Sequence, residues 1–242
     1  MHVHLPKPMH GWREFAGEVG IIVIGVLIAL GAEQVIESLR WQREAHEAIA
    51  SLKDEIADHY FSGSEAMIAA PCIDRQLALL EQRLTKPGSY APAPMYSESS
   101  IDYTFRAPDR LWSDDVWRSI VSEGVASHLP ADIRLSLAAY YSQVAGARTN
   151  NAETQILNYR LRVLAQPLQP DVATRARLIE EIEEARGRFK EAALYSSQML
   201  RNSEEIKLNP SQQYLNERLA RSGTIKFCRA HQLPLGNNRA VF

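Results

Sequence analysis

The feature that most constrains this chain is an uncharged run of fourteen residues, VGIIVIGVLIALGA, which lies between Glu18 and Glu33. As an α-helix this run covers only about 21 Å, whereas the hydrocarbon core of a bilayer is roughly 30 Å thick. Ionised groups cost far less near the edges of that core than at its centre. Extending the run to Phe15 and Ile36 supplies the missing length, so we predict a transmembrane helix over residues 15–36.

Tryptophans at both ends support this prediction. Trp12 and Trp41 would lie at the two membrane interfaces, where aromatic anchors are enriched. Two alternatives stay open: a cleaved signal peptide, because residues 29–31 loosely resemble a cleavage site, and a buried core helix, because the strictly apolar run is short. Glu14 and Glu18 disfavour the signal peptide, because the first region of such a peptide is positively charged.

One face of the predicted span combines small residues with an acid. At about 100° per residue, five side chains fall within about 80° of one another: Glu18, Ile22, Gly25, Ala29 and Ala32. Gly25 and Ala29 have the small-xxx-small spacing that lets two helices approach closely in lipid. We therefore predict that this packing face contacts other transmembrane helices, either of a second copy or of a larger membrane complex. The simpler alternative is that Glu18 reaches the interface and the small residues are incidental.

The remaining sequence favours an all-α fold. Apolar residues make up 45% of the 242 residues, and beyond the N-terminus they recur at helical rather than alternating spacing. We expect a short tail over residues 1–14, the span over 15–36 and a helical extramembrane domain over 37–242. The formal net charge of -2, with basic and acidic residues interleaved, excludes a phosphate-tracking surface. The expected partners are thus the lipid bilayer and other helices, and not nucleic acid.

Six helical segments are predicted, and the first continues directly from the span. They cover residues 34–61, 72–84, 114–123, 131–165 and 171–207, and a last helix follows Asn209-Pro210 and ends at Gly223. We expect a short interruption at residues 62–64 that breaks or kinks the helix, a cap at Ser113, a left-handed Gly124 and an irregular tail after Gly223. Residues 87–112 hold four of the twelve prolines, which indicates an ordered loop over the bundle or a functional flap.

Two cysteines, Cys72 and Cys228, are the only ones in the chain. An even count in an extramembrane domain fits one disulfide in an oxidising compartment, and two unrelated buried thiols are the alternative. Charge does not orient the span, because Lys7 and Arg13 precede it and a similar number of basic residues follows it. The disulfide favours a bacterial inner-membrane protein whose C-terminal domain is periplasmic.

No local pattern carries chemistry. None of the seven histidines lies in a His-Glu-x-x-His arrangement, and there is no Gly-x-Ser-x-Gly elbow and no glycine-rich phosphate loop. Acid pairs such as Asp114-Asp115 fit a solvated helix surface or the first turn of a helix. The sequence therefore predicts no catalytic residue, no metal site and no cofactor.

The N-terminal stretch WREFAGEVGIIVIGVLIALGAEQ resembles a family of bacterial single-pass membrane proteins of unknown function. The residues that carry this resemblance are Gly17-Glu18 and the later run Gly25-Val26-Leu27-Ile28-Ala29-Leu30. A second stretch, VWRSIVSEGVASHLPADIRLSLAAYY, is loosely similar to a helical segment of that family. The resemblance implies an envelope protein with an extramembrane helical domain, and it implies no catalytic residues.

Three functions are compatible with these features. The first, which we favour, is a non-enzymatic accessory or scaffold subunit of a cell-envelope membrane complex that packs through its transmembrane helix. The second is a signal-transmitting ectodomain coupled to the membrane by the helix over 34–61. The third is an envelope enzyme with the 87–112 loop as a lid. A deep pocket lined by ionisable groups under that loop would favour the enzyme.

Overall fold

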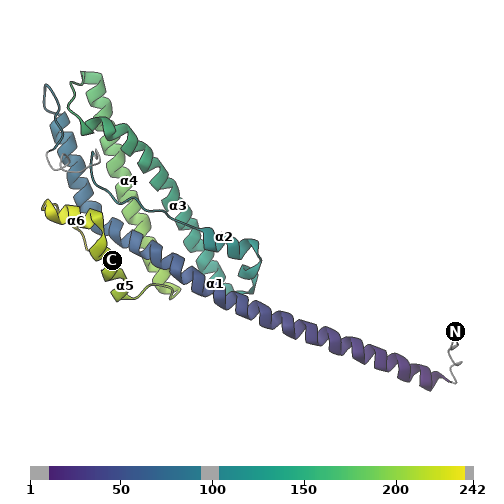
Figure 1. Ribbon diagram of the computed structural model, residues 1–242. Coiled ribbons are helices and arrows are strands. Elements are labelled where there is room, and N and C mark those ends of the chain that lie inside the picture. The colour runs from purple at the N-terminus through teal and green to yellow at the C-terminus, as the bar shows by residue number, and fades with distance from the viewer. Residues whose placement is uncertain (1–10, 94–103, 238–242) are drawn as a thin grey trace, which may run out of the picture. The chain divides into compact units, whose positions relative to one another are not determined.

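The computed structural model describes residues 11–93 and 104–237, and every regular element in these ranges is a helix. The predicted all-α class is confirmed (Figure 1). The helices are α1 (Trp12–Leu84), α2 (Asp115–Ser122), α3 (Ala131–Leu161), α4 (Val172–Glu205), α5 (Gln212–Arg221) and α6 (Gly223–Ala230), with short 3-10 helices η2 (Val125–His128) and η3 (Arg162–Ala165). The chain divides into two compact units, Met1–Glu47 and Ala48–Phe242.

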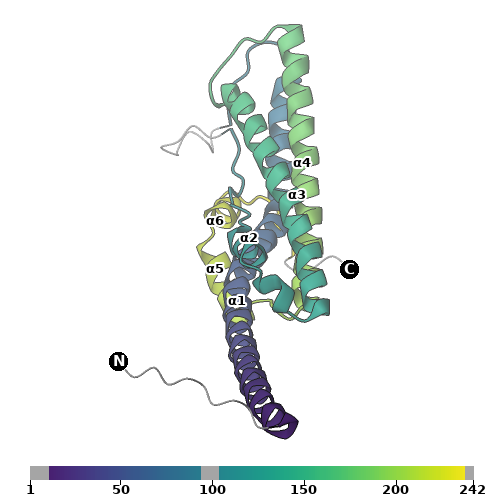
Figure 2. The ribbon, with the colours of Figure 1, turned by 90° about the vertical axis from the view of Figure 1, so that its right-hand side faces the viewer.

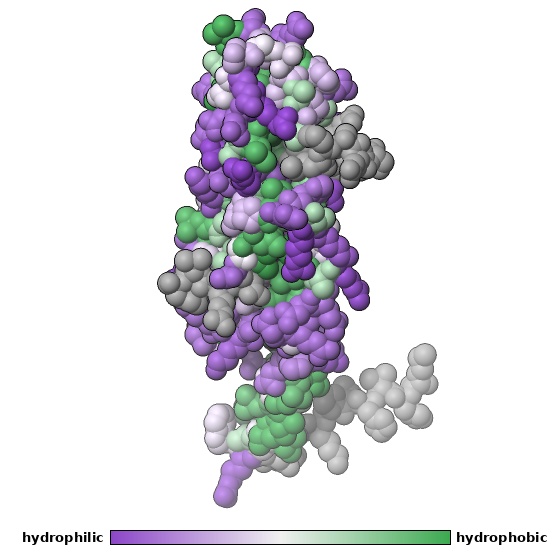
Figure 3. All heavy atoms as spheres, turned by 90° about the vertical axis from the view of Figure 1, so that its left-hand side faces the viewer, coloured by the Kyte–Doolittle hydropathy of each residue, from purple (hydrophilic) through white to green (hydrophobic). Residues whose placement is uncertain are grey.

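The first unit holds the N-terminal part of α1. The side chains described from Trp12 to Arg40 are exposed, apart from the partly covered Gly20. Figure 3 shows this segment as a contiguous hydrophobic surface, in contrast to the largely polar surface of the second unit. Among the described helices, α1 is the one that is long and apolar enough to cross a membrane.

The second unit is built around a three-helix bundle of α1, α3 and α4, which lie side by side (Figures 1 and 2). Four apolar residues that lie at helical spacing on one face of α1 are buried: Ile73, Leu77, Leu80 and Leu84. They meet Leu157 and Leu161 of α3 and Leu178, Ile182 and Ala185 of α4 in one cluster. The 3.6-residue periodicity of the sequence therefore identified the faces that form the core.

Of the two outcomes expected at residues 62–64, the break is wrong, because α1 continues without interruption to Leu84. A Cβ atom on Gly63 would lie 2.6 Å from Cδ1 of Leu200 and 3.3 Å from Cβ of Ser196. The small residues at this point therefore let α4 approach α1 closely, and the Ser62 hydroxyl donates to the Asp58 carbonyl one turn earlier. Tertiary packing overrides the local tendency of this triplet to end a helix.

Pro71 lies inside α1, which bends where it passes α6 (Figure 1). A proline lacks the amide hydrogen and displaces the carbonyl one turn before it, which is a usual cause of a helix bend. Next to the bend, Cys72 forms a disulfide with Cys228 of α6, with an S–S distance of 2.05 Å. The predicted pairing is confirmed.

The C-terminal segment is more regular than expected. Gly223 does not end the last helix but begins a further one, α6, and the Ser222 hydroxyl accepts a hydrogen bond from the Ile225 amide at 3.0 Å. A serine at this position satisfies one of the amides that a helix start leaves unpaired, which explains the start. In the same way Asp171 caps α4, as the sequence indicates, through the Thr174 amide.

The start of α2 also differs by one residue. The cap is Asp114 rather than Ser113, although the Ser113 hydroxyl accepts a hydrogen bond from the Asp115 amide at 3.2 Å. Gly124 has φ 81°, which confirms the predicted left-handed residue after the helix.

Candidate functional site

The predicted packing face lies on the first unit, and all of its residues are exposed: Glu18, Ile22, Gly25, Ala29 and Ala32. A Cβ added at Gly25 meets no atom of the chain within 4 Å, and the same holds for Gly20 and Gly31. The face is therefore exposed within the first unit, with open space at Gly25. The predicted interfacial anchor Trp41 donates a hydrogen bond to Glu37 at 3.4 Å, and Trp12 is 78% exposed.

In the second unit, the described end of the proline-rich loop forms an extended strap, residues 104–114, along α1. Three buried polar residues of α1, which we call fasteners, hold the strap by hydrogen bonds. Along the strap they are met in the order Gln76, Glu65 and Glu55, which is the reverse of their order along α1. The strap therefore runs antiparallel to α1 until α2 begins. The other described part of the loop is fixed as well, because the Tyr90 hydroxyl donates to the Leu164 carbonyl at 2.9 Å.

The first fastener is the carboxamide of Gln76, which is fully buried. Its oxygen accepts from the Arg106 amide at 2.7 Å, and its nitrogen donates to the Arg106 carbonyl at 3.0 Å. The same nitrogen lies 3.3 Å from the sulfur of Cys72. One buried side chain thus pairs both ways with a peptide of the strap and links it to the disulfide.

The second fastener is Glu65, whose side chain has no solvent exposure. Arg110 of the strap donates two hydrogen bonds to its carboxylate, at 2.6 and 3.0 Å, and the Ser222 hydroxyl donates a third. The Arg110 guanidinium also lies 4.9 Å from the centre of the Phe61 ring. Burying a carboxylate is costly unless it is well paired, and the pairing of Glu65 joins α1, the strap and the start of α6.

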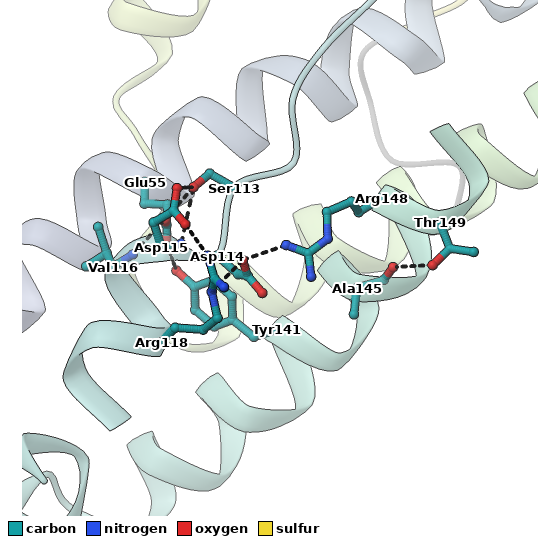
Figure 4. Close-up of polar contacts among 10 residues, drawn as sticks. All are labelled: Glu55, Ser113, Asp114, Asp115, Val116, Arg118, Tyr141, Ala145, Arg148 and Thr149. Carbon is teal, nitrogen blue, oxygen red and sulfur yellow. Dashed lines mark hydrogen bonds and ion pairs between the residues drawn. The ribbon is translucent and has the colours of Figure 1, made fainter. Parts of the chain in front are cut away.

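The third fastener is Glu55, which is shown with its neighbours in Figure 4. Its carboxylate accepts hydrogen bonds from the Ser113 hydroxyl at 3.2 Å, from the Val116 amide at 3.1 Å and from the Tyr141 hydroxyl at 2.5 Å. Glu55 therefore caps α2 from a different helix and joins it to α3. Burial and the bonded carboxylate raise the pKa of Tyr141 far above its ordinary value.

Asp114 adds an ion pair at the same junction. It accepts from Arg148 of α3 at 2.6 Å and lies 3.1 Å from Arg118 of α2 (Figure 4). These arginines, Arg148 above all, hold the pKa of the Asp114 carboxyl below its usual value. The expectation that the acid pair is solvated helix surface is therefore incomplete, because Asp114 connects two helices.

His59 is enclosed by aromatic rings beside this junction. It is only 2% exposed, and its ring centre lies 5.6 Å from that of Trp112 and 5.9 Å from that of Tyr140. Nδ1 lies 3.2 Å from the Tyr140 hydroxyl, while Nε2 makes no hydrogen bond within the described residues. Burial lowers the pKa of His59, and the negative charge of Glu55 offsets part of this effect. The imidazole is thus held neutral, which suits a packed core better than proton transfer at a surface.

A cleft of about 480 Å³ lies between the strap, α3 and the start of α6. Its lining includes ionisable groups from the strap and from the start of η3, among them Arg106, Asp109 and Arg162. The cleft is open to solvent, and it lies beside the segment that the sequence indicated as a possible lid. The sequence predicted neither the cleft nor the three fasteners. For the fasteners the reason is that buried and solvated polar residues of α1 do not differ in their spacing along the sequence.

Within the ranges described, no group of three or more His, Cys, Asp or Glu side chains could hold a metal ion. Residues 94–103 of the proline-rich loop, and residues 1–10 of the predicted N-terminal tail, lie outside the described residues. Comparisons with known proteins match no family model, no curated protein and no solved structure. The family resemblance of the N-terminal stretch therefore stays a prediction.

Proposed function

We propose that this chain is a membrane-anchored helical interaction protein, an accessory or scaffold subunit of a cell-envelope membrane complex, without enzymatic activity. In this proposal, residues 15–36 cross the inner membrane of a bacterium and the helical bundle lies in the periplasm. The observation that carries it is the packing face on a helix whose apolar side chains are exposed in the part of the chain that the structure describes.

The chemistry of that face supports helix–helix association rather than simple anchoring. An anchor needs only apolar length, whereas Gly25 and Ala29 form a shallow surface against which a second backbone can pack. Glu18 on the same stripe is costly against acyl chains and is best accommodated beside a polar group of a partner. The periplasmic location is supported by the Cys72–Cys228 disulfide, because such bonds persist in oxidising compartments.

The test is to purify the tagged full-length protein from its native membranes in mild detergent and identify its partners by mass spectrometry. Wild type is compared with Gly25→Leu and with a matched control, Gly20→Leu, which lies about 140° away around the helix. Both glycines have open space around them, so neither leucine clashes within the chain. Each substitution should also favour the helix by about 1 kcal/mol.

We expect a stoichiometric partner, or a second copy, with wild type and with Gly20→Leu, and its loss with Gly25→Leu. Far-ultraviolet circular dichroism should be the same for all three proteins. Recovery of the monomer alone from wild type, or equal association of the two variants, would contradict the proposal.

A further inference from the structure

A second uncharged face runs along α3, and we call it the seam. It consists of exposed residues at alternating intervals of four and three, a spacing that keeps them on one side of a helix. Thr149 and Ala152 form its centre. The residues on either side of the centre are Ala138, Ser142, Ala145, Ile156, Tyr159 and Val163, the last of which belongs to η3.

This pattern is unusual for a helix at a protein surface. The core side of α3 is already apolar and buried, through Leu137 and Val144 among others. The outer side of such a helix normally carries charged residues, and α4 follows this rule with the exposed Arg177, Glu180 and Glu184. A helix that is uncharged on both sides is typical of one that is covered on both sides.

The two halves of the seam differ in side-chain size. The three residues before the centre are two alanines and a serine. The three residues after it are large, and each is at least half exposed: Ile156 at 53%, Tyr159 at 71% and Val163 at 50%. The seam therefore changes from shallow to raised along the helix.

A second α3 in the reverse direction matches this change in size. When two copies pack about a two-fold axis between Asn150 and Asn151, each small residue faces a large one. The facing pairs are Ala138 with Val163, Ser142 with Tyr159, and Ala145 with Ile156. A parallel pair would instead place each residue on its own copy, which holds the helices apart at Tyr159 and leaves space at Ala145.

From this pattern we infer that the seam is an interface with a second copy of this chain, formed by two antiparallel α3 helices. A standard interface involves about 20–30 residues on each side, so the eight seam residues place this contact at the weak end. It therefore joins chains that a membrane holds at high local concentration, and it dissociates in dilute detergent extracts. The seam is separate from the packing face and rests on the proposed function only for the membrane location.

The test is cysteine crosslinking between two differently tagged copies expressed in the same cells. One copy carries Ala138→Cys and the other Val163→Cys, both with Gly25→Leu so that the packing face does not hold them together. A short bismaleimide is added to the membrane fraction, where it reacts with free thiols, whereas the native cysteines are bonded to each other. In the control, Ser136→Cys replaces Ala138→Cys, because Ser136 is exposed but lies about 160° away around the helix.

We expect a doubly tagged product from Ala138→Cys with Val163→Cys and roughly five-fold less from the control. Two copies of Ala138→Cys should give none, because their thiols would lie about 37 Å apart. Tyr159→Glu in both copies should remove the product, because a carboxylate would then be buried against Ser142.

Four results would overturn the inference: no doubly tagged product, an equal amount from the Ser136→Cys control, an unchanged amount with Tyr159→Glu, or crosslinking of Ala138→Cys to its own copy. Recovery of the chains in the membrane fraction tests the anchor separately, so failure of the seam is distinguishable from failure of the proposed function.

Discussion

Breaking the ion pair between Arg110 and Glu65 should cost a different amount of stability depending on which of the two residues is replaced. The Glu65 side chain has no solvent exposure, whereas that of Arg110 is 39% exposed. Replacing Arg110 with methionine leaves a buried carboxylate whose remaining donor is the Ser222 hydroxyl. Removing one partner of a buried ion pair costs about 3–5 kcal/mol, and we expect the lower end because that hydroxyl still donates.

The reverse substitution should cost less. Glu65→Gln keeps an oxygen that accepts from Arg110, and the guanidinium that loses its counter-charge is already partly hydrated. We expect a loss at the lower end of the range of about 1.5–3 kcal/mol that a hydrogen bond to a charged group contributes. The double variant Arg110→Met/Glu65→Met should be more stable than Arg110→Met alone, since it leaves no buried charge.

Urea unfolding of the full-length protein in detergent, followed by tryptophan fluorescence, measures these differences. Trp112 is a buried residue of the strap itself, so its emission should respond to release of this segment. Equal losses for Arg110→Met and Glu65→Gln, or a double variant less stable than either, would refute the reasoning from burial.

Three further predictions concern the bundle. Replacing both Cys72 and Cys228 with serine should lower the free energy of unfolding by up to about 5 kcal/mol, because the bond closes a loop of 156 residues. Urea titrations with and without reductant should then give the same free energy of unfolding for the variant, but different values for wild type. The lowered pKa of His59 means that the folded state favours the neutral ring. The contribution of this ring to stability is therefore complete above pH 6.5 and is lost as the pH falls below that value. His59→Gln should flatten this part of the plot of stability against pH, and an unchanged slope would count against the buried neutral ring. Gly63→Ala should destabilise by about 1 kcal/mol or more through the contact with Leu200, whereas Gly187→Ala, with open space around it, should stabilise by about 0.5–1 kcal/mol; thermal melts that rank them the other way would contradict the close approach of α4.

The helical faces of the second unit could be predicted because burial follows the 3.6-residue period. Along α4, Leu178, Ile182, Ala185, Ser196 and Met199 recur at helical spacing on one face. All five are buried, while Phe189 and Ala192 on the same face are partly buried. The disulfide could be predicted because the chain offers only one pairing.

The parts that escaped prediction depend on contacts distant in sequence. Residues 62–64 contain the typical signals of a break, yet Gly63 serves the approach of α4. The eight-residue α6 is too short to be stable alone, and its start is set by Ser222 and its place by Cys228. The buried Gln76, Glu65 and Glu55 lie among ordinary polar residues of a helix, and only the path of the strap distinguishes them.

The most direct test of the proposed packing face is site-specific photocrosslinking in living cells. A benzophenone amino acid is placed at Ile22, on the face, or at Leu27, about 180° from Glu18 around the helix. Both side chains are exposed, at 65% and 61%, so the two positions are equally accessible within the chain. We expect a discrete crosslinked protein product from position 22 and none from position 27. Equal products from both positions, or none from either, would contradict a partner bound to this face.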